Sequence, residues 1–182
     1  MLEPNCSRWL RCLWLGSVAA TAVHAGTPDL DDEPPRSFES THQLVIGNAK
    51  LRFRAIAGEI DVTNARGESV ARIFSTTYLR DPGDARRPVV FAFNGGPGSA
   101  STWLHMGLLG PKRVVVPGDA VDDGAAPLDV VDNEHSPLDV ADLVLIDPVG
   151  TGFSRALQGH ENREFWGVGQ DADLLANFVR QW

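Results

Sequence analysis

Cysteine is scarce in this sequence of 182 residues, which holds only Cys6 and Cys12. Both lie within residues 1–25, a segment that we expect to be removed as a secretory signal. The mature chain then has no thiol. Disulfides, zinc–thiolate sites and a cysteine nucleophile are therefore excluded from the mature protein.

Positive charge and metal-ligand patterns are also in short supply. Lysine and arginine number 16 against 24 acidic residues, which gives a net charge of −8 and no electrostatic support for nucleic-acid binding. His42, His105 and His135 stand singly rather than in a His-x-x-x-His pattern, and we interpret each as a solvated or packed histidine. The acidic loop around Asp122 lacks the spacing of a calcium loop. We therefore expect no metal and no other cofactor.

The apolar run near the amino terminus, residues 12–23, is shorter than the roughly 20 residues that a membrane-spanning helix needs. It follows Arg8 and Arg11 and precedes a small-residue cleavage site at residues 23–25. This order is typical of a cleaved secretory signal, with a membrane anchor as the alternative. We predict a signal peptide over residues 1–25, a secreted or periplasmic protein, and no membrane association after cleavage.

The remaining composition is that of a globular protein, with 43% apolar and 22% charged residues. Residues 26–40 are rich in proline and acidic side chains, which predicts a flexible leader. Residues 41–182 are then long enough to form one domain with a buried core. We find no internal repeat in the sequence.

The expected domain begins with stretches that are typical of antiparallel strands joined by hairpins. Residues 43–63 alternate loosely between apolar and polar side chains, with breaks at 47–48 and 57–58. A turn signal at residues 64–67 separates them from a second stretch at 69–79, which is rich in β-branched and aromatic residues. These features predict an antiparallel start to the sheet.

Two apolar stretches further along, residues 89–93 and 141–147, predict buried strands, and we expect the first to be central and covered on both faces. Between them, residues 102–109 favour a short helix and residues 117–126 a polar loop. Residues 163–182 place apolar side chains on one face, as in an amphipathic helix. The sequence therefore predicts both strands and helices in this domain.

The strand at 89–93 runs directly into Asn94-Gly95-Gly96-Pro97-Gly98. Glycine permits positive φ and lets a substrate approach the backbone closely, whereas Pro97 has no N–H and fixes its own φ. Such a loop can aim backbone N–H groups at one point, as an oxyanion hole requires. A glycine-rich turn without chemistry is the alternative interpretation.

The segment Asn94-Gly95-Gly96-Pro97-Gly98-Ser99 resembles the Asn-Gly-Gly-Pro-Gly motif of the serine carboxypeptidase family. Further similar elements follow in the family's order: Gly110-Pro111, Asn133-Glu134-His135-Ser136, the run from Asp147 to Ser154, and Phe165-Trp166-Gly167-Val168. The last of these resembles the bacterial secreted branch. The likeness extends from about Gln43 to Trp182, and several ordered motifs are more specific than one glycine loop.

The resemblance implies an α/β-hydrolase fold, present here incompletely as the N-terminal antiparallel strands and the first parallel strands of the central sheet. It implies a serine-type carboxypeptidase that releases C-terminal residues from a peptide substrate through an acyl-enzyme. By the same resemblance, the N–H of Gly96 is the oxyanion-hole donor, and Asn94 and Gly95 bind the terminal carboxylate of the peptide. For Asn94, a side chain that caps its own loop is the alternative.

Three positions depart from the pattern of the family. Ala92 stands where members usually have tryptophan, and Leu108 where they usually have glutamate; both positions belong to the carboxylate-binding network of the family. Ser99 replaces a cysteine after the glycine loop. The departures at Ala92 and Leu108 leave an esterase or acyltransferase on the same fold as an alternative function.

The segment Gly152-Phe153-Ser154-Arg155-Ala156 is similar to a Gly-x-Ser-x-Gly nucleophile elbow, which needs a strand directly before the serine and a helix directly after it. Here the predicted strand ends near Asp147. His160 is the only histidine after Ser154 and precedes Asp171, whereas such hydrolases order their triad Ser, Asp, His. We therefore interpret Ser154 as part of a structural loop and Asp147 as a loop anchor.

The nucleophile, acid and base of the family follow the helix that we expect at residues 163–182. We therefore expect all three outside this chain, which would be the N-terminal part of a longer carboxypeptidase. Alone it would be inactive, since hydrolases without their serine and histidine retain only weak catalysis. A non-enzymatic remnant or binding module is the remaining alternative.

Overall fold

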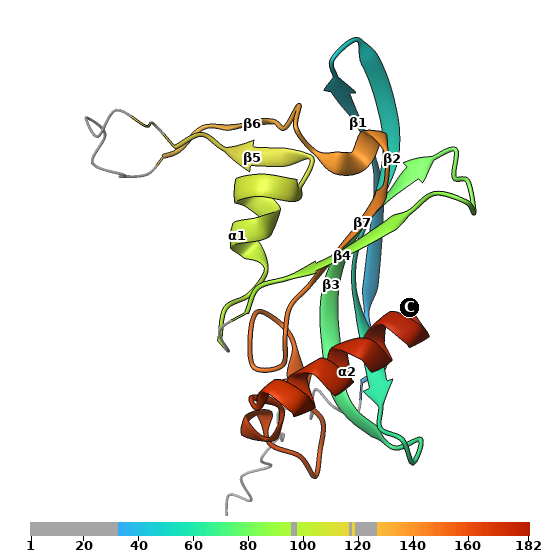
Figure 1. The fold of residues 1–182 in the computed structure, drawn as a ribbon, viewed down its shortest axis with the longest axis vertical. Coiled ribbons are helices and arrows are strands. Elements are labelled where there is room, and N and C mark those ends of the chain that lie inside the picture. The colour runs from blue at the N-terminus through green and yellow to red at the C-terminus, as the bar shows by residue number, and fades with distance from the viewer. Residues whose placement is uncertain (1–32, 96–97, 117, 119–126) are drawn as a thin grey trace, which may run out of the picture.

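A computed structural model describes residues 33–95, 98–116, 118 and 127–182 (Figure 1). The expected signal at 1–25, part of the expected leader and nearly all of the expected polar loop at 117–126 lie outside the described residues. Strand β1 begins at Ser37, so residues 37–40 belong to the sheet and not to a flexible leader. Their main-chain groups are engaged by pairing with β2.

Three long antiparallel strands form one side of the main sheet (Figure 1). They are β1 (Ser37–Ile46), β2 (Ala49–Thr63) and β3 (Ser69–Asp81). The predicted hairpins are confirmed, but the predicted break at 57–58 does not occur. Gly58 pairs with Ser37 on one side and Ser75 on the other, and a Cβ on it would lie 3.0 Å from the Ser37 hydroxyl oxygen. The glycine marks close strand packing rather than a turn.

Two parallel strands, β4 (Val89–Phe93) and β7 (Asp142–Ile146), complete the order β1-β2-β3-β7-β4. A short strand, β8 (Arg155–Ala156), pairs beside β3. Both predicted strands are confirmed. Within the described residues β4 pairs with β7 alone, and its central position in a complete sheet stays a prediction. Val89 and Phe93 are accordingly 36% and 45% exposed.

Strand β7 separates two apolar cores because successive side chains point to opposite faces of a strand. Val144 and Ile146 pack on the face that is crossed by α2 (Val168–Gln181) (Figure 1). Leu143 and Leu145 pack on the opposite face. The core beneath α2 includes Leu174, Leu175 and Phe178 of that helix.

The opposite core is closed by short helical turns: α1 (Thr102–Leu104), the π-helical turn η1 (His105–Leu109) and the 3₁₀ turn η2 (Pro137–Asp139). Leu104, Leu109 and Leu138 of these turns pack in the cluster that contains Leu143 and Leu145. A separate hairpin of β5 (Lys112–Val114) and β6 (Val130–Asp132) extends from them. The helix predicted at 102–109 is therefore confirmed as α1 followed by η1.

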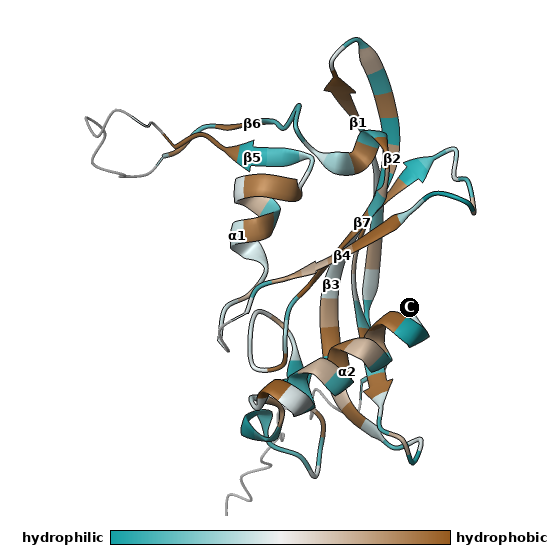
Figure 2. Cartoon of the chain, in the orientation of Figure 1, coloured by the Kyte–Doolittle hydropathy of each residue, from teal (hydrophilic) through white to brown (hydrophobic). Residues whose placement is uncertain are grey.

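Helix α2 begins later than the predicted residue 163. The 3₁₀ turn η3 (Asn162–Phe165) comes first, and a capping box between Glu161 and Glu164 caps its start. Extended backbone at Gly167 then separates this turn from α2. Figure 2 shows apolar and polar residues side by side along α2, as the amphipathic pattern predicts.

Candidate functional site

The glycine loop follows β4, and both of its ends are held at the end of β7. Phe93, the last residue of β4, pairs with Ile146 of β7. Seven residues after Asn94, the Ser101 hydroxyl donates to the Ile146 carbonyl, and the Ser101 N–H donates to Oδ1 of Asp147 at 2.8 Å. The residues before and after the loop are therefore both held next to Ile146 and Asp147, at the end of β7.

Of the three residues expected to act in this loop, Asn94 and Gly95 are described, whereas Gly96 lies outside the described residues. The Asn94 side-chain amide donates to the Ser99 hydroxyl at 3.1 Å, a bond to another side chain of the loop and not to the loop's own main chain. Gly95 is exposed, and a Cβ on it would meet no atom within 4 Å. The main chain at Gly95 is therefore open to a ligand.

A partly buried carboxyl and imidazole and a buried phenol lie close to Ser101, at the end of this loop. The Tyr78 hydroxyl and Nε2 of His105 are 2.5 Å apart and share a hydrogen bond. Burial raises the pKa of Tyr78 to about 12. Burial also lowers the pKa of His105, while attraction to Asp147 acts in the opposite direction.

The carboxyl of Asp147 is affected by the same surroundings. Burial raises its pKa, and the hydrogen bond from the Ser101 N–H and the attraction of His105 counteract part of this rise. The sequence predicted Asp147 as a loop anchor, and its bond to Ser101 agrees with that role. His105 was interpreted only as solvated or packed, and no spacing rule joins it to Tyr78, because the two residues lie on different elements.

The carbonyl groups at the end of η1 are satisfied by two buried side chains. The Asn133 amide donates to the carbonyls of Leu108 and Gly110, both at 2.8 Å, and the Ser136 hydroxyl donates to the carbonyl of Leu109 at 2.8 Å. The Asn-x-x-Ser element thus holds the helical turn that follows the glycine loop. Unpaired carbonyls at a buried helix end would be unfavourable.

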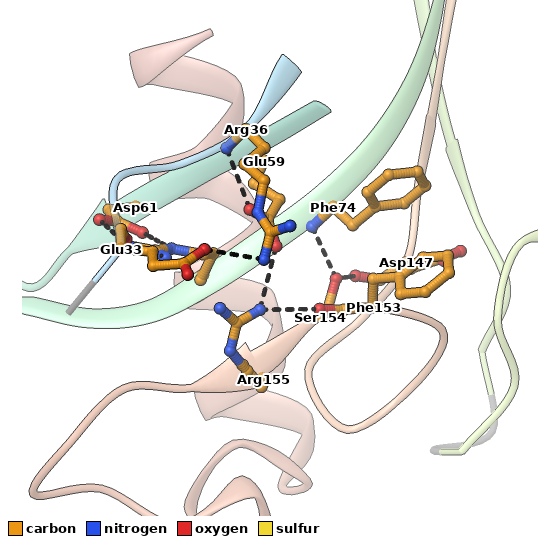
Figure 3. A network of polar contacts seen from close by, with 10 residues as sticks. Glu33, Arg36, Glu59, Asp61, Phe74, Asp147, Phe153, Ser154 and Arg155 are labelled. Atoms are coloured by element: carbon orange, nitrogen blue, oxygen red, sulfur yellow. Dashed lines mark hydrogen bonds and ion pairs between the residues drawn. The ribbon is translucent and has the colours of Figure 1, made fainter. Parts of the chain in front are cut away.

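Ser154 is a buried structural residue in the loop after β7 (Figure 3). Its hydroxyl donates to the Asp147 carbonyl at 2.6 Å and accepts the N–H of Phe74 at 2.8 Å. The residues that follow it form strand β8 and not a helix. This geometry differs from a nucleophile elbow, which exposes its serine at a strand-to-helix turn.

A network of ion pairs ties this loop to the start of the sheet (Figure 3). Arg155 contacts Glu59 at 3.0 Å, and the N–H of Arg36 donates to the same carboxylate at 3.1 Å. Burial acts to raise the pKa of Glu59, but these hydrogen bonds and the nearby arginine charges outweigh it and hold the pKa below its usual value. Every described cation of this network has an acidic partner, so we assign it to the fold.

Two apolar cavities are lined in part by residues that precede or follow the glycine loop. One of about 480 Å³ lies against α1 and η1, where the side chain of Trp103 is 78% exposed. The other, of about 650 Å³, lies between Phe93 and α2. The lining of the first cavity contains a single charged residue among those described, Arg113. Both are large enough for an apolar side chain.

The described residues contain neither a metal-binding cluster nor a helix that could span a membrane. Among the described residues, no group of three or more histidine, cysteine, aspartate or glutamate side chains could hold a metal ion. In the same part of the chain, no helix has the length and apolar character needed to cross a membrane.

Comparison with known proteins identifies one family. The family model described as serine carboxypeptidase matches residues 47–182, which is most of the chain and includes the glycine loop, the Asn133–Ser136 element and α2. A search of curated proteins finds no match. The predicted family is therefore confirmed, and with it the α/β-hydrolase fold, of which the mixed sheet described above is a part.

Proposed function

Because the chain belongs to the serine carboxypeptidase family, we propose that it is part of a serine-type carboxypeptidase that releases C-terminal residues from peptides through an acyl-enzyme. The main observation behind this proposal is the glycine loop: β7 holds the residues at both of its ends, and the space beside Gly95 is free of other atoms. In this proposal Asn94 and Gly95 bind the terminal carboxylate of the substrate. The Gly96 N–H stabilises the oxyanion.

The described geometry supports this role because a loop fixed at both ends presents its main chain without reorganising during the reaction. One oxyanion-hole donor typically lowers a reaction barrier by about 2.7–4 kcal/mol. The cavity beside Trp103 begins directly after the loop, where a side chain of a bound peptide has room. An apolar lining favours substrates with apolar side chains at that position.

The covalent chemistry requires residues other than those in this chain. Ser154 is buried and its hydroxyl is occupied by Asp147 and Phe74, so it does not serve as the nucleophile. Residues 155–182 contain no histidine that follows an aspartate, as the triad order of these hydrolases requires. We propose that nucleophile, acid and base lie elsewhere in the enzyme and that residues 1–182 alone do not catalyse peptide cleavage.

An esterase or acyltransferase is the second candidate. Leu108, at a position where the family usually has a glutamate of the carboxylate-binding network, is 60% exposed. A protonated glutamate can donate a hydrogen bond to the carboxylate of a peptide, whereas leucine has no polar group that could do so. The leucine therefore favours substrates without a free C-terminus. For either reaction, we propose a signal at residues 1–25 and a secreted or periplasmic location.

These proposals are separated by assaying the protein purified from the cells that make it. The substrates are one peptide with a free C-terminus, the same peptide with a C-terminal amide, and the matching ester. Cleavage of the free peptide alone supports the carboxypeptidase, and cleavage of the ester alone supports the second candidate. If none is cleaved, both enzymatic proposals are wrong and a binding module or remnant is left.

A further inference from the structure

Four residues at the end of the glycine loop form a connected cluster, which we name the loop clamp: Ser101, Asp147, His105 and Tyr78. We propose that Asp147 is a positioning residue whose ionised carboxylate holds the end of the glycine loop, and that His105, fixed by Tyr78, controls this ionisation. The position of the loop end then depends on pH. The consequence for catalysis rests on the proposed carboxypeptidase function, whereas the clamp itself does not.

Ser101 is the point at which Asp147 acts on the loop. Its side chain is only 2% exposed, its N–H donates to Oδ1 of Asp147 at 2.8 Å, and its hydroxyl donates to the carbonyl of Ile146. Helix α1 begins at the next residue, Thr102. The carboxylate therefore holds the junction between the glycine loop and the helical turns that follow it.

Asp147 itself has little freedom to move. Its main-chain carbonyl accepts the Ser154 hydroxyl at 2.6 Å, and its N–H donates to the carbonyl of Phe74 at 3.1 Å. Gly152, with φ of 52°, lies so close that a Cβ there would be 2.0 Å from Oδ2 of Asp147. Only glycine at this position leaves room for the carboxylate.

His105 is also held in one place. Its N–H donates to the carbonyl of Ser101 at 2.8 Å, so the imidazole lies one helical turn beyond the residue that Asp147 binds. Its Nε2 shares a 2.5 Å hydrogen bond with Tyr78, whose side chain on β3 is 8% exposed. Gly110 packs against the same imidazole, and a Cβ there would be 2.6 Å from its Cδ2.

The charges in the clamp are few and each has a known partner. Asp147 interacts electrostatically with His105, the one titratable group among the described residues that affects its pKa. Tyr78, which contacts His105 from β3, stays neutral at physiological pH because its pKa is about 12. Ser154 and Gly152, which contact Asp147 from its own loop, carry no charge. The charge of each group therefore favours the ionised form of the other.

The sign of the pH effect follows from burial. Because burial raises the pKa of Asp147, its carboxylate takes up a proton at a higher pH than an exposed aspartate does. A neutral carboxyl is a weaker acceptor for the Ser101 N–H than a carboxylate is. Acidification through this pKa therefore loosens the loop end, and neutral pH holds it in place.

The first test measures the imidazole pKa of His105 by NMR in residues 1–182. Asp147→Asn keeps the shape and an oxygen that can accept the Ser101 N–H, but removes the negative charge. We expect the pKa of His105 to fall in this variant, because the attraction that favours the imidazolium is lost. Asp173→Asn, an exposed aspartate on α2, makes the same change in net charge and should leave the pKa of His105 unchanged. An unchanged pKa in Asp147→Asn overturns the proposal.

The second test measures hydrogen exchange at the Ser101 N–H, with the N–H of Asn133, bound to the carbonyl of Pro111 at 2.9 Å, as reference. Asp147→Ala should speed exchange at Ser101 roughly 10- to 100-fold relative to the reference, since a hydrogen bond to a charged acceptor is removed. In the unchanged protein the ratio of the two rates should rise as the pH falls through the titration of Asp147. In Asp147→Asn it should stay flat.

The exchange experiment contradicts the proposal if the ratio of rates has the same pH dependence in the unchanged protein and in Asp147→Asn. Because Asp147→Asn removes no atom from the cluster, this comparison remains decisive even if Asp147→Ala does not fold. Neither readout uses enzymatic activity. A failure of the carboxypeptidase proposal would therefore leave these results intact, and a failure of the clamp would leave the substrate assay intact.

Discussion

The hydroxyl of Ser154 donates a hydrogen bond to the main-chain carbonyl of Asp147 at 2.6 Å and accepts one from the N–H of Phe74 at 2.8 Å. One side chain thus joins the loop after β7 to strand β3. We predict that Ser154→Ala lowers the free energy of unfolding by about 1–3 kcal/mol, because a buried N–H loses its partner. Urea unfolding measures this change.

A matched control for this prediction is Ser40→Ala, since Ser40 is exposed and the one bond described for its hydroxyl is to the exposed His42. Its effect should stay within about 0.5 kcal/mol. A fluorophosphonate probe should not label Ser154 in the folded chain. Labelling at this serine would mean that its hydroxyl is accessible and reactive, contrary to the structural role assigned to it.

Gly110 and Gly107 provide a paired test of the packing around η1. A Cβ on Gly110 would be 2.4 Å from the carbonyl oxygen of His105, whereas a Cβ on Gly107 would meet nothing within 4 Å. We predict that Gly110→Ala destabilises the fold by about 1–3 kcal/mol or more, because main-chain atoms must shift. Gly107→Ala should be neutral or stabilising by up to about 1 kcal/mol. Equal effects of the two substitutions would contradict the described packing.

Tyr78 is the single tyrosine of the chain, so the ultraviolet absorbance of phenolate reports on it alone. Burial raises its pKa to about 12, so little phenolate should form at pH 10 to 11 in the folded protein. In urea the same titration should move to the ordinary tyrosine value of about 10. A midpoint near 10 in the folded protein would show that the phenol is solvated and that its contact with His105 is not maintained.

His105 should make stability depend on pH near neutrality. Burial lowers its pKa in the folded state, so the unfolded state binds more protons as the pH falls below about 6.5, the ordinary value for histidine. The stability contributed by neutral His105 is complete above this value and is lost as the pH falls through the folded pKa. His105→Gln, which does not titrate, should lose less stability over the same range. Urea unfolding at several pH values compares the two proteins.

His160→Gln is a suitable control for the His105 experiment, because His160 lies at the surface beside Glu164 and away from the loop clamp. Its substitution should leave the acid-dependent loss of stability attributed to His105 in place. If the unchanged protein and His105→Gln lose stability in parallel between neutral and acidic pH, burial of His105 does not contribute as described.

Local signals in the sequence were sufficient to predict most strands and the glycine loop. Strand β7 was evident as a continuous apolar run, and β2 and β3 as alternating stretches separated by the turn at 64–67. These signals depend on neighbouring residues alone, which is why the sequence carries them. The interruption expected at Gly58 was wrong because glycine there accommodates the Ser37 side chain of the adjacent strand, a non-local cause.

The arrangement of the site could not be read in the same way. The neighbours of β4 depend on residues far from it in the sequence: among the described residues it pairs with β7 alone, and its apolar run does not indicate that partner. The contact between Tyr78 and His105 joins β3 to η1 across many intervening residues. The start of α2 had a signal that was overlooked, the Glu161-x-x-Glu164 capping box, which begins a separate turn before the helix.

The central proposal is that this chain supplies the oxyanion-hole part of a serine carboxypeptidase whose nucleophile lies elsewhere in the enzyme. The most direct test treats the protein from its native cells with a fluorophosphonate and maps the modified serine by mass spectrometry. The account predicts one modified serine outside residues 1–182, with loss of C-terminal residue release from a free peptide. Modification of a serine within residues 1–182, or peptide cleavage that persists after complete modification, would contradict it.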